Sequence, residues 1–159
     1  MKSLGSTLVL ICGLLLLDGA GARDMLHFPL FGFSIAPLEA RSSGPTSVVM
    51  EMFLPPSGGF APNVRVEAQK WPGTLDQYVE VSQKQFEKAG FKVINSSRPD
   101  ASTAIFEFTG TLQNHPLHWY AKASLGGGEV LLTTATATEQ QWPTNGQQLQ
   151  ACVNSFRRD

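Results

Sequence analysis

Residues 103–138 read TAIFEFTGTLQNHPLHWYAKASLGGGEVLLTTATAT, and they carry the clearest pattern in the chain. Apolar and polar residues alternate along most of this stretch, which is typical of strands with one buried face. Strands are therefore expected at 103–113, 116–125 and 129–138. Asn114-His115 and Gly126-Gly127-Gly128 supply turns between them, so the three strands should form an antiparallel meander.

Two helices are expected around this meander. Thr74 and Gln77 form the capping-box pattern T-x-x-Q at the start of the first helix, and Gly90 is suited to end it. The apolar positions of this helix recur at helical spacing: Leu75, Tyr78, Val79, Ser82, Phe86 and Ala89. The second helix lies at the C-terminus, with one apolar face formed by Leu149, Cys152, Val153 and Phe156.

Four further strands are expected at 31–35, 47–53, 64–69 and 91–96. In 64–69, the side chains of Arg65, Glu67 and Gln69 should face water. Short hairpin links forbid an all-parallel sheet. We therefore predict an α+β domain, an α/β/α sandwich whose central antiparallel sheet is flanked by helices. Ten residues are expected to be mostly buried: Val64, Val66, Tyr78, Phe86, Phe106, Phe108, Trp119, Leu132, Cys152 and Phe156.

Residues 1–22 have the pattern of a secretory signal peptide, with Lys2, an apolar run at 8–17 and the cleavage signal Ala20-Gly21-Ala22. The alternative, an uncleaved membrane anchor, would need a longer apolar run. A lipid anchor at Cys12 is disfavoured because Ile11, not a small residue, precedes it. Cleavage before Arg23 leaves Cys152 as the single cysteine, so no intramolecular disulfide is expected. A periplasmic or secreted location follows.

Composition restricts the possible partners of this 159-residue chain. The apolar share of 42% suits one globular domain, and the charged share is low at 16%. A formal net charge of −1 gives no support for a nucleic acid or an anionic membrane as partner. After signal cleavage, no stable membrane insertion is expected.

Three features suggest chemistry, and each has a simpler structural interpretation. His115 and His118 could bind a metal, but residues three apart on a strand point to opposite faces, which favours solvated histidines near a turn. Cys152 could be a nucleophile, but its place among apolar helix positions favours a structural thiol. The triple glycine lacks the Lys-Ser/Thr of a phosphate-binding loop, so it predicts a turn.

The sequence predicts no catalytic, metal-binding or cofactor-binding residues. Acidic residues are scattered singly, and motifs such as G-x-S-x-G and H-E-x-x-H do not occur. Asn95-Ser96-Ser97 matches a glycosylation sequon, which matters only in a eukaryotic secretory pathway.

Partner contacts are expected from the apolar segment 23–31, in which Pro29 prevents a continuous strand. The interpretation that this segment packs on its own domain stays open beside docking to a partner. Trp71 and Trp142 lie next to turns, and we expect them to cover the core. For Phe60, a place over the core and a partner contact both stay open. The candidate partner-binding residues are Leu26, Phe28, Leu30, Phe31 and Phe60.

The chain resembles the PsbP superfamily, which includes an extrinsic photosystem II protein, a bacterial envelope protein and a Ran-binding import factor of yeast. The matching stretches are 32–35 (GFSI), 63–66 (NVRV), 74–78 (TLDQY), 131–136 (LLTTAT) and 155–157 (SFR). The organisation is then a signal peptide at 1–22, an apolar segment at 23–31 and a PsbP-like domain at 32–159. The resemblance implies an α/β/α sandwich and a non-enzymatic accessory protein. No plant-type transit peptide precedes the domain, which favours a bacterial periplasmic relative.

Three functions follow as hypotheses. The first is an accessory protein that acts through protein–protein contacts and uses no cofactor, its partner another envelope or secreted protein. The alternative is a carrier of a small ligand or lipid, which needs a pocket between helix and sheet. A hydrolase that uses Cys152 ranks third.

Overall fold

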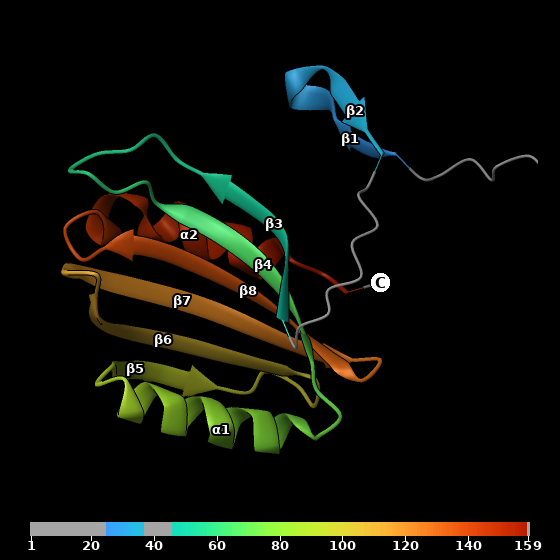
Figure 1. The fold of residues 1–159 in the computed structure, drawn as a ribbon, viewed down its shortest axis with the longest axis vertical. Helices are drawn as coiled ribbons and strands as arrows, with labels where there is room; N and C mark the ends of the chain where they lie inside the picture. Colours follow the sequence, from blue (N-terminus) through green and yellow to red (C-terminus); the bar gives the residue numbers. More distant parts are fainter. Residues whose placement is uncertain (1–24, 37–45, 159) are drawn as a thin grey trace, which may run out of the picture. The chain divides into compact units, whose positions relative to one another are not determined.

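The structure is a computed structural model that describes residues 25–36 and 46–158 (Figure 1). The chain divides into two compact units, Met1–Arg41 and Ser42–Asp159. The predicted signal peptide at 1–22 lies outside the described residues. The predicted boundary between the apolar segment and the PsbP-like domain, at residue 32, falls inside the described part of the first unit.

The second unit is built on a six-stranded sheet in which every neighbouring pair is antiparallel. The strand order is β3-β4-β8-β7-β6-β5. Their bounds are Thr46–Phe53 (β3), Asn63–Lys70 (β4), Lys92–Ser97 (β5), Thr103–Leu112 (β6), His115–Gly126 (β7) and Glu129–Thr138 (β8). The predicted meander forms the β6-β7-β8 part of this sheet.

The two hairpin turns of the meander have left-handed backbone conformations. Gly127 and Gly128 turn the chain between β7 and β8 with φ of 59° and 76°, as the triple glycine predicts. Between β6 and β7 the turn residues are Gln113 and Asn114, with φ of 51° and 65°. The predicted Asn114-His115 turn is therefore wrong by one residue, because His115 already pairs with Leu112.

Helix α1 (Leu75–Lys88) packs on one face of the sheet. The predicted capping box is present: the Thr74 hydroxyl accepts from the Gln77 backbone N–H, and the Gln77 side chain accepts from the Thr74 N–H. The buried residues of this helix, among them Tyr78 and Val79, meet apolar residues of β6 and β7, including Phe106.

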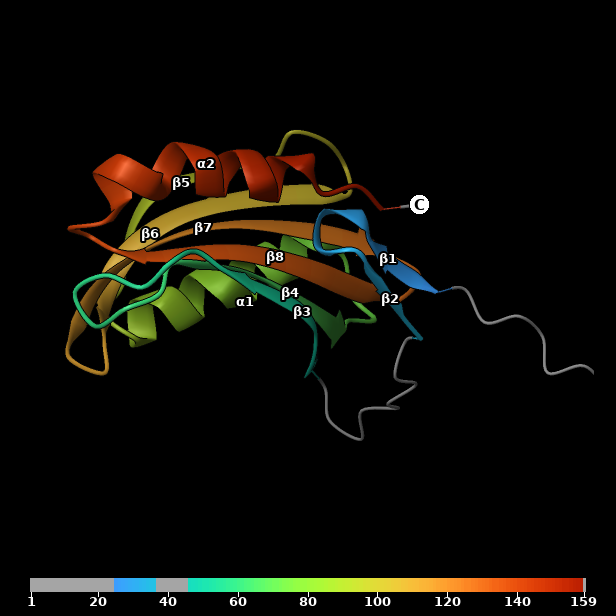
Figure 2. The same ribbon diagram turned by 90° about the horizontal axis from the view of Figure 1, so that it is seen from above.

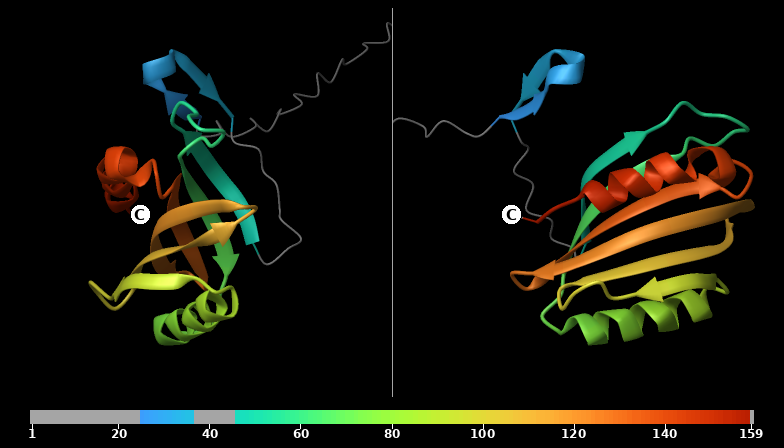
Figure 3. Two further views of the ribbon diagram at one scale, coloured as in Figure 1. Left: turned by 90° about the vertical axis from the view of Figure 1, so that its left-hand side faces the viewer. Right: turned by 180° about the vertical axis from the view of Figure 1, so that it is seen from behind.

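Helix α2 (Trp142–Ser155) packs on the opposite face, over β8, β7 and β4 (Figure 2). Leu149 and Val153 are buried, as predicted, but Phe156 lies just beyond the helix as its C-terminal cap. Figure 3 shows α2 along β8 and α1 along β5. The α+β class with an antiparallel sheet is confirmed, but residues 46–158 are mostly sheet, and within them one helix packs on each face.

The predicted core is largely confirmed. Six of the ten residues are buried: Val64, Val66, Tyr78, Phe106, Phe108 and Trp119. The other four are half-buried: Phe86, Leu132, Cys152 and Phe156. Phe86 and Leu132 line a cavity beside α1, which accounts for their partial exposure.

The described part of the first unit is a small hairpin. Strand β1 (Leu26–Phe28) pairs with β2 (Phe33–Ile35), and a 3₁₀ turn, η1 (Pro29–Phe31), joins them. The predicted strand at 31–35 is therefore shorter, and it belongs to this two-stranded sheet rather than to the large one. Phe31 lies in the turn because Pro29 begins it, at a position where proline is favoured.

Candidate functional site

Four of the five predicted partner-binding residues lie on the hairpin of the first unit. Leu30 and Phe31 at its tip are 88% and 74% exposed, and Leu26 is 49% exposed. Phe28 is half-buried, and its ring stacks on Phe33 at 4.9 Å between centroids. The hairpin therefore presents two apolar side chains at its tip, while Phe28 serves mainly to hold its two strands together.

Short-range contacts fix the shape of this tip. Gly32 has a φ of 69° and donates its N–H to the Pro29 carbonyl at 3.3 Å. A hydrogen bond of 2.8 Å joins His27 Nδ1 to the Ser34 hydroxyl across the strands. An apolar tip on a fixed turn loses less conformational freedom on binding than a free arm would.

Phe60, the fifth predicted residue, belongs to the second unit and is half-buried against its core. It closes a tight turn with Ser57, in which each residue donates its N–H to the carbonyl of the other at 3.0–3.1 Å. The side chain of Gln141 holds this turn: Nε2 donates to the Ser57 carbonyl and hydroxyl and to the Phe60 carbonyl. The turn that contains Gly58 and Gly59 is thus tied to the start of α2.

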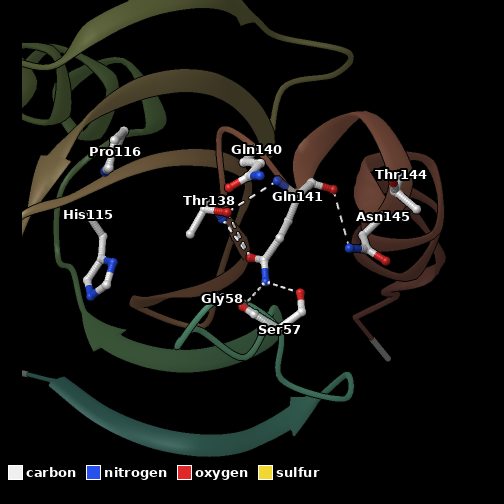
Figure 4. Close-up of a pocket in the computed structure, with 9 residues that line it drawn as sticks. All are labelled: Ser57, Gly58, His115, Pro116, Thr138, Gln140, Gln141, Thr144 and Asn145. Atoms are coloured by element: carbon white, nitrogen blue, oxygen red, sulfur yellow. Dashed lines mark hydrogen bonds between the residues drawn. The ribbon is translucent and has the colours of Figure 1, made fainter.

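A polar cavity of about 460 Å³ lies beside this turn (Figure 4). Its lining comes from the 57–58 turn, the start of β7 and the first residues of α2, including Thr144 and Asn145. Gln141 is fully occupied, because its Oε1 also accepts from the N–H and hydroxyl of Thr138 at 3.1 and 3.0 Å. The buried amide thus supports the wall and leaves no free group for a ligand.

A second hollow lies on the face of the sheet that carries α1, next to the helix, where the helix does not cover the strands. One cavity of about 330 Å³ is lined by Tyr78, Ser82 and Phe86 of α1 and by Leu132 of β8. A cavity of about 450 Å³ adjoins it at Thr134 and continues along β4. We call these two cavities together the groove. The volume of each lies in the range typical of small-ligand sites.

A row of polar side chains follows β4 along the groove. Tyr78 donates its hydroxyl to Gln69 at 2.8 Å, Gln69 donates to Glu67 at 3.5 Å, and Arg65 pairs with Glu67 at 2.7 Å. We call Arg65, Glu67, Gln69 and Tyr78 the polar row. The prediction that the β4 members face water needs correction: they are half-buried, because they line the two cavities beside α1 and the neighbouring strands.

Burial acts on one hydroxyl of the polar row, that of Tyr78. It raises the pKa of Tyr78 to about 12; a hydrogen bond with Ser82 works against this shift, and the charge of Glu67 adds to it. The Tyr78 hydroxyl therefore stays a neutral donor at all physiological pH values. The Nε atom of Arg65 is buried without a hydrogen-bond partner in the described part of the chain.

His118 departs most from the sequence-based expectation, because it is buried instead of solvated. Its Nε2 lies 2.9 Å from a carboxylate oxygen of Glu107, and its Nδ1 lies 3.1 Å from one of Glu139. Its ring stacks on Trp142. A neutral imidazole has one N–H, so only the protonated ring donates to both carboxylates at once. Sequence reasoning missed the carboxylates because they come from other elements, β6 and the loop after β8.

The other side chains singled out by the sequence lie around the edges of the core. His115 is half-buried near Phe60, with 5.9 Å between ring centroids. Cys152 is a half-buried free thiol that packs against the α2 side of the core. Trp71 and Trp142 cover the edges of the core, as predicted.

Neither a metal-binding cluster nor a membrane-spanning helix is present among residues 25–36 and 46–158. In these ranges, no group of three or more His, Cys, Asp or Glu residues is arranged to hold a metal ion. No helix in the same part of the chain is long and apolar enough to cross a membrane.

Comparisons with known proteins identify the fold and nothing further. No protein-family model matches the chain, and no curated protein matches it. The crystal structure of PA94, a Pseudomonas aeruginosa protein of unknown function, is similar, with a TM-score of 0.62 and 16% identity over 87% of this chain and 99% of PA94. The solution structure of the PsbP of Synechocystis sp. PCC 6803 gives a TM-score of 0.48 and 13% identity, over 89% of this chain and 96% of that one. At 16% identity, the likeness to PA94 shows a shared fold alone.

Proposed function

We propose that this protein is a non-enzymatic accessory protein of the periplasm or the secreted space that binds another protein through its apolar hairpin. The observation that carries the proposal is the exposure of Leu30 and Phe31 at the tip, 88% and 74%. Large apolar side chains that project from a fixed turn are typical anchors for a groove on a partner. Burial of each would contribute about 1.5–3 kcal/mol before ordering costs.

The hairpin is also suited to this role by its lack of charge. Residues 25–36 contain His27 as their single titratable side chain, so docking into an apolar groove desolvates no carboxylate or ammonium group. A membrane surface would bury the same side chains but usually requires basic residues for attraction to anionic lipids. Residues 25–36 contain no Lys or Arg, which favours a protein partner.

The test is capture of the partner from the native envelope fraction with the chain that begins at residue 23. A Leu30→Ser/Phe31→Ser variant should lose a partner that the wild type recovers in stoichiometric amount. The matched control, Val93→Ser/Ile94→Ser, removes two exposed apolar side chains of β5 and should retain the partner. Equal recovery by both variants would exclude the hairpin as the contact, and binding of the wild type to neutral phospholipid vesicles would indicate lipid instead.

The melting temperature distinguishes a hairpin that docks to a partner from one that packs on its own chain. Deletion of residues 23–30 should leave the melting temperature unchanged while partner recovery is lost. A decrease of several degrees would mean that the segment packs on its own domain, because about 1 kcal/mol shifts the melting temperature of a domain of this size by a few degrees.

The groove supports a second function, the carriage of a small amphipathic ligand. Its apolar lining comes from Phe86, Phe106, Phe108 and Leu132, and polar groups of Tyr78 and Gln69 converge at one side. Such a combination of apolar walls and few polar groups is typical of ligand sites.

The amphipathic fluorophore 1-anilinonaphthalene-8-sulfonate provides the test of this second function. Saturable fluorescence enhancement should be lost in Ser82→Leu, which places a larger side chain in the cavity. It should be kept in the matched control Gln83→Leu, because Gln83 lies on the exposed side of α1. Equal enhancement in both variants would exclude the groove.

A further inference from the structure

Strand β3 lies at one end of the strand order, so one of its sides has no neighbour among the described strands. A β-bulge at Val49 interrupts its pairing with β4, because Val48 pairs with Glu67 and Met50 already with Val66. Bulges twist an edge and discourage further pairing. The regular part of the strand beyond the bulge, Met50–Phe53, is the segment that can accept another strand; we call it the open edge.

The register shows which backbone groups of the open edge point outward. Leu54 donates its N–H to the Pro62 carbonyl at 2.8 Å, so Leu54 belongs to a hydrogen-bonded pair. Hydrogen-bonded pairs alternate along an antiparallel ladder, and the pairs Met52↔Val64 and Met50↔Val66 follow at steps of two. The N–H and C=O groups of Glu51 and Phe53 therefore point away from β4.

Exposed apolar side chains flank the open edge on both faces of the sheet. Met50 and Met52 are 40% and 42% exposed and lie on the α2 side, since they pair with Val66 and Val64. Phe53 is 61% exposed and lies on the opposite face. An added strand would place its alternate side chains beside these residues, and apolar residues opposite the two methionines would extend the sheet surface.

Glu51 determines which charge a partner strand should carry. It lies directly opposite Arg65 on β4, but the guanidinium of Arg65 is engaged with Glu67 at 2.7 Å. Glu51 forms no ion pair with another described residue. A cross-strand basic residue is therefore the complement that the open edge lacks.

We propose that the open edge binds an extended segment of a partner protein as an additional strand, with apolar residues beside Met50 and Met52 and a Lys or Arg opposite Glu51. Pairing of this kind takes its affinity from backbone hydrogen bonds and its specificity from alternate side chains. A second copy of the same strand is a poorer occupant, because Thr46–Phe53 contains no basic residue to meet Glu51. The proposal is independent of the hairpin.

The probe is the peptide acetyl-TVKVTVT-amide, whose valines share one face and whose lysine lies on the other. Its binding to the chain that begins at residue 23 is followed by backbone amide chemical shifts and by hydrogen exchange. We expect saturable shifts at Met50–Phe53 and exchange slowed by about tenfold or more at the amides of Glu51 and Phe53. The same peptide with glutamate in place of lysine should bind more weakly.

Two variants make the test specific. Phe53→Pro removes an outward N–H and leaves the hydrogen bonds to β4 intact, as edge positions allow; affinity should fall by about tenfold relative to the matched Phe53→Ala. Glu51→Lys should reverse the preference and favour the glutamate peptide, and this variant decides the matter if Phe53→Pro does not fold.

Other results would overturn the proposal. Absence of shifts at Met50–Phe53 up to millimolar peptide, or equal binding of both peptides, would exclude the charge-matched strand. Protection of Glu51 and Phe53 without peptide would mean that the edge is already occupied: protection that rises with protein concentration indicates a second copy, and concentration-independent protection indicates the same chain.

Discussion

The rings of His118 and Trp142 stack with centroids 3.8 Å apart and planes 14° apart, which joins the first residue of α2 to strand β7. Glu107 and Glu139 each contact one of the two ring nitrogens. Stacked aromatic rings add an attraction beyond the area that they bury. The position of α2 on the sheet thus depends on one buried polar contact as well as on its apolar face.

Replacement of His118 should destabilise the fold strongly. His118→Gln is expected to lower the free energy of unfolding by about 2–4 kcal/mol, because it removes the buried ring that stacks on Trp142 and contacts both Glu107 and Glu139. Denaturant unfolding measures the loss. His115→Gln is the control and should cost less than about 1 kcal/mol, since the His115 side chain forms no hydrogen bond with another described residue. Equal losses would contradict the assigned role of His118.

Phe86 tests the apolar face of α1. Its ring stacks on Phe108 at 4.3 Å and meets Phe106 edge-on at 5.5 Å. Phe86→Ala should therefore destabilise by about 2–4 kcal/mol, somewhat below the cost for a fully buried ring, because Phe86 is half-buried. Val81→Ala, at an exposed position of the same helix, should cost below about 1 kcal/mol. Denaturant unfolding of both variants compares them directly, and a loss of that small size at Phe86 would mean that this face does not pack as described.

Gln141 should contribute more to the stability of the fold than its exposed neighbour Gln140. Gln141→Leu keeps the approximate size of the side chain but removes the amide hydrogen bonds to Ser57 and Phe60, whose carbonyls then keep only the N–H of the other turn residue. The expected loss is about 2–3 kcal/mol, together with faster hydrogen exchange at Ser57 and Phe60. Gln140→Leu should stay within about 0.5 kcal/mol of the wild type. A neutral result for Gln141→Leu would show that other contacts hold the turn.

Alkaline pH should weaken the fold through Tyr78. The pKa of its hydroxyl is about 12 in the folded chain, against an ordinary value of 10.0. The folded state holds this proton more tightly than the unfolded state does. The protonated hydroxyl therefore adds about 2–3 kcal/mol to the free energy of unfolding below pH 10, and this contribution is lost as pH rises toward 12. Unfolding measured from pH 8 to 12 should show this decline. Tyr78→Phe should reduce it, and an unchanged decline would assign it to other groups.

The local elements are predictable because their signals lie within a few residues. The capping box at Thr74 and Gln77 requires only a spacing of three, and the turn at Gly127 and Gly128 requires only residues that tolerate positive φ. The β6–β7 turn is harder to place because Gln113 adopts positive φ, which glutamine rarely does.

Periodicity and turn residues act over short distances, so the amino-acid sequence alone was enough to predict the antiparallel meander, both helices and most of the core. The grouping of the polar residues could not be predicted in this way. The folded chain brings Glu107 and Glu139 to His118, brings Gln69 of β4 to Tyr78 of α1, and leaves the open edge of β3 without a neighbour among the described strands. These relationships depend on strand order and on where each helix lies over the sheet. Contacts between residues far apart in the chain set both, and a local pattern of residues carries no information about such contacts.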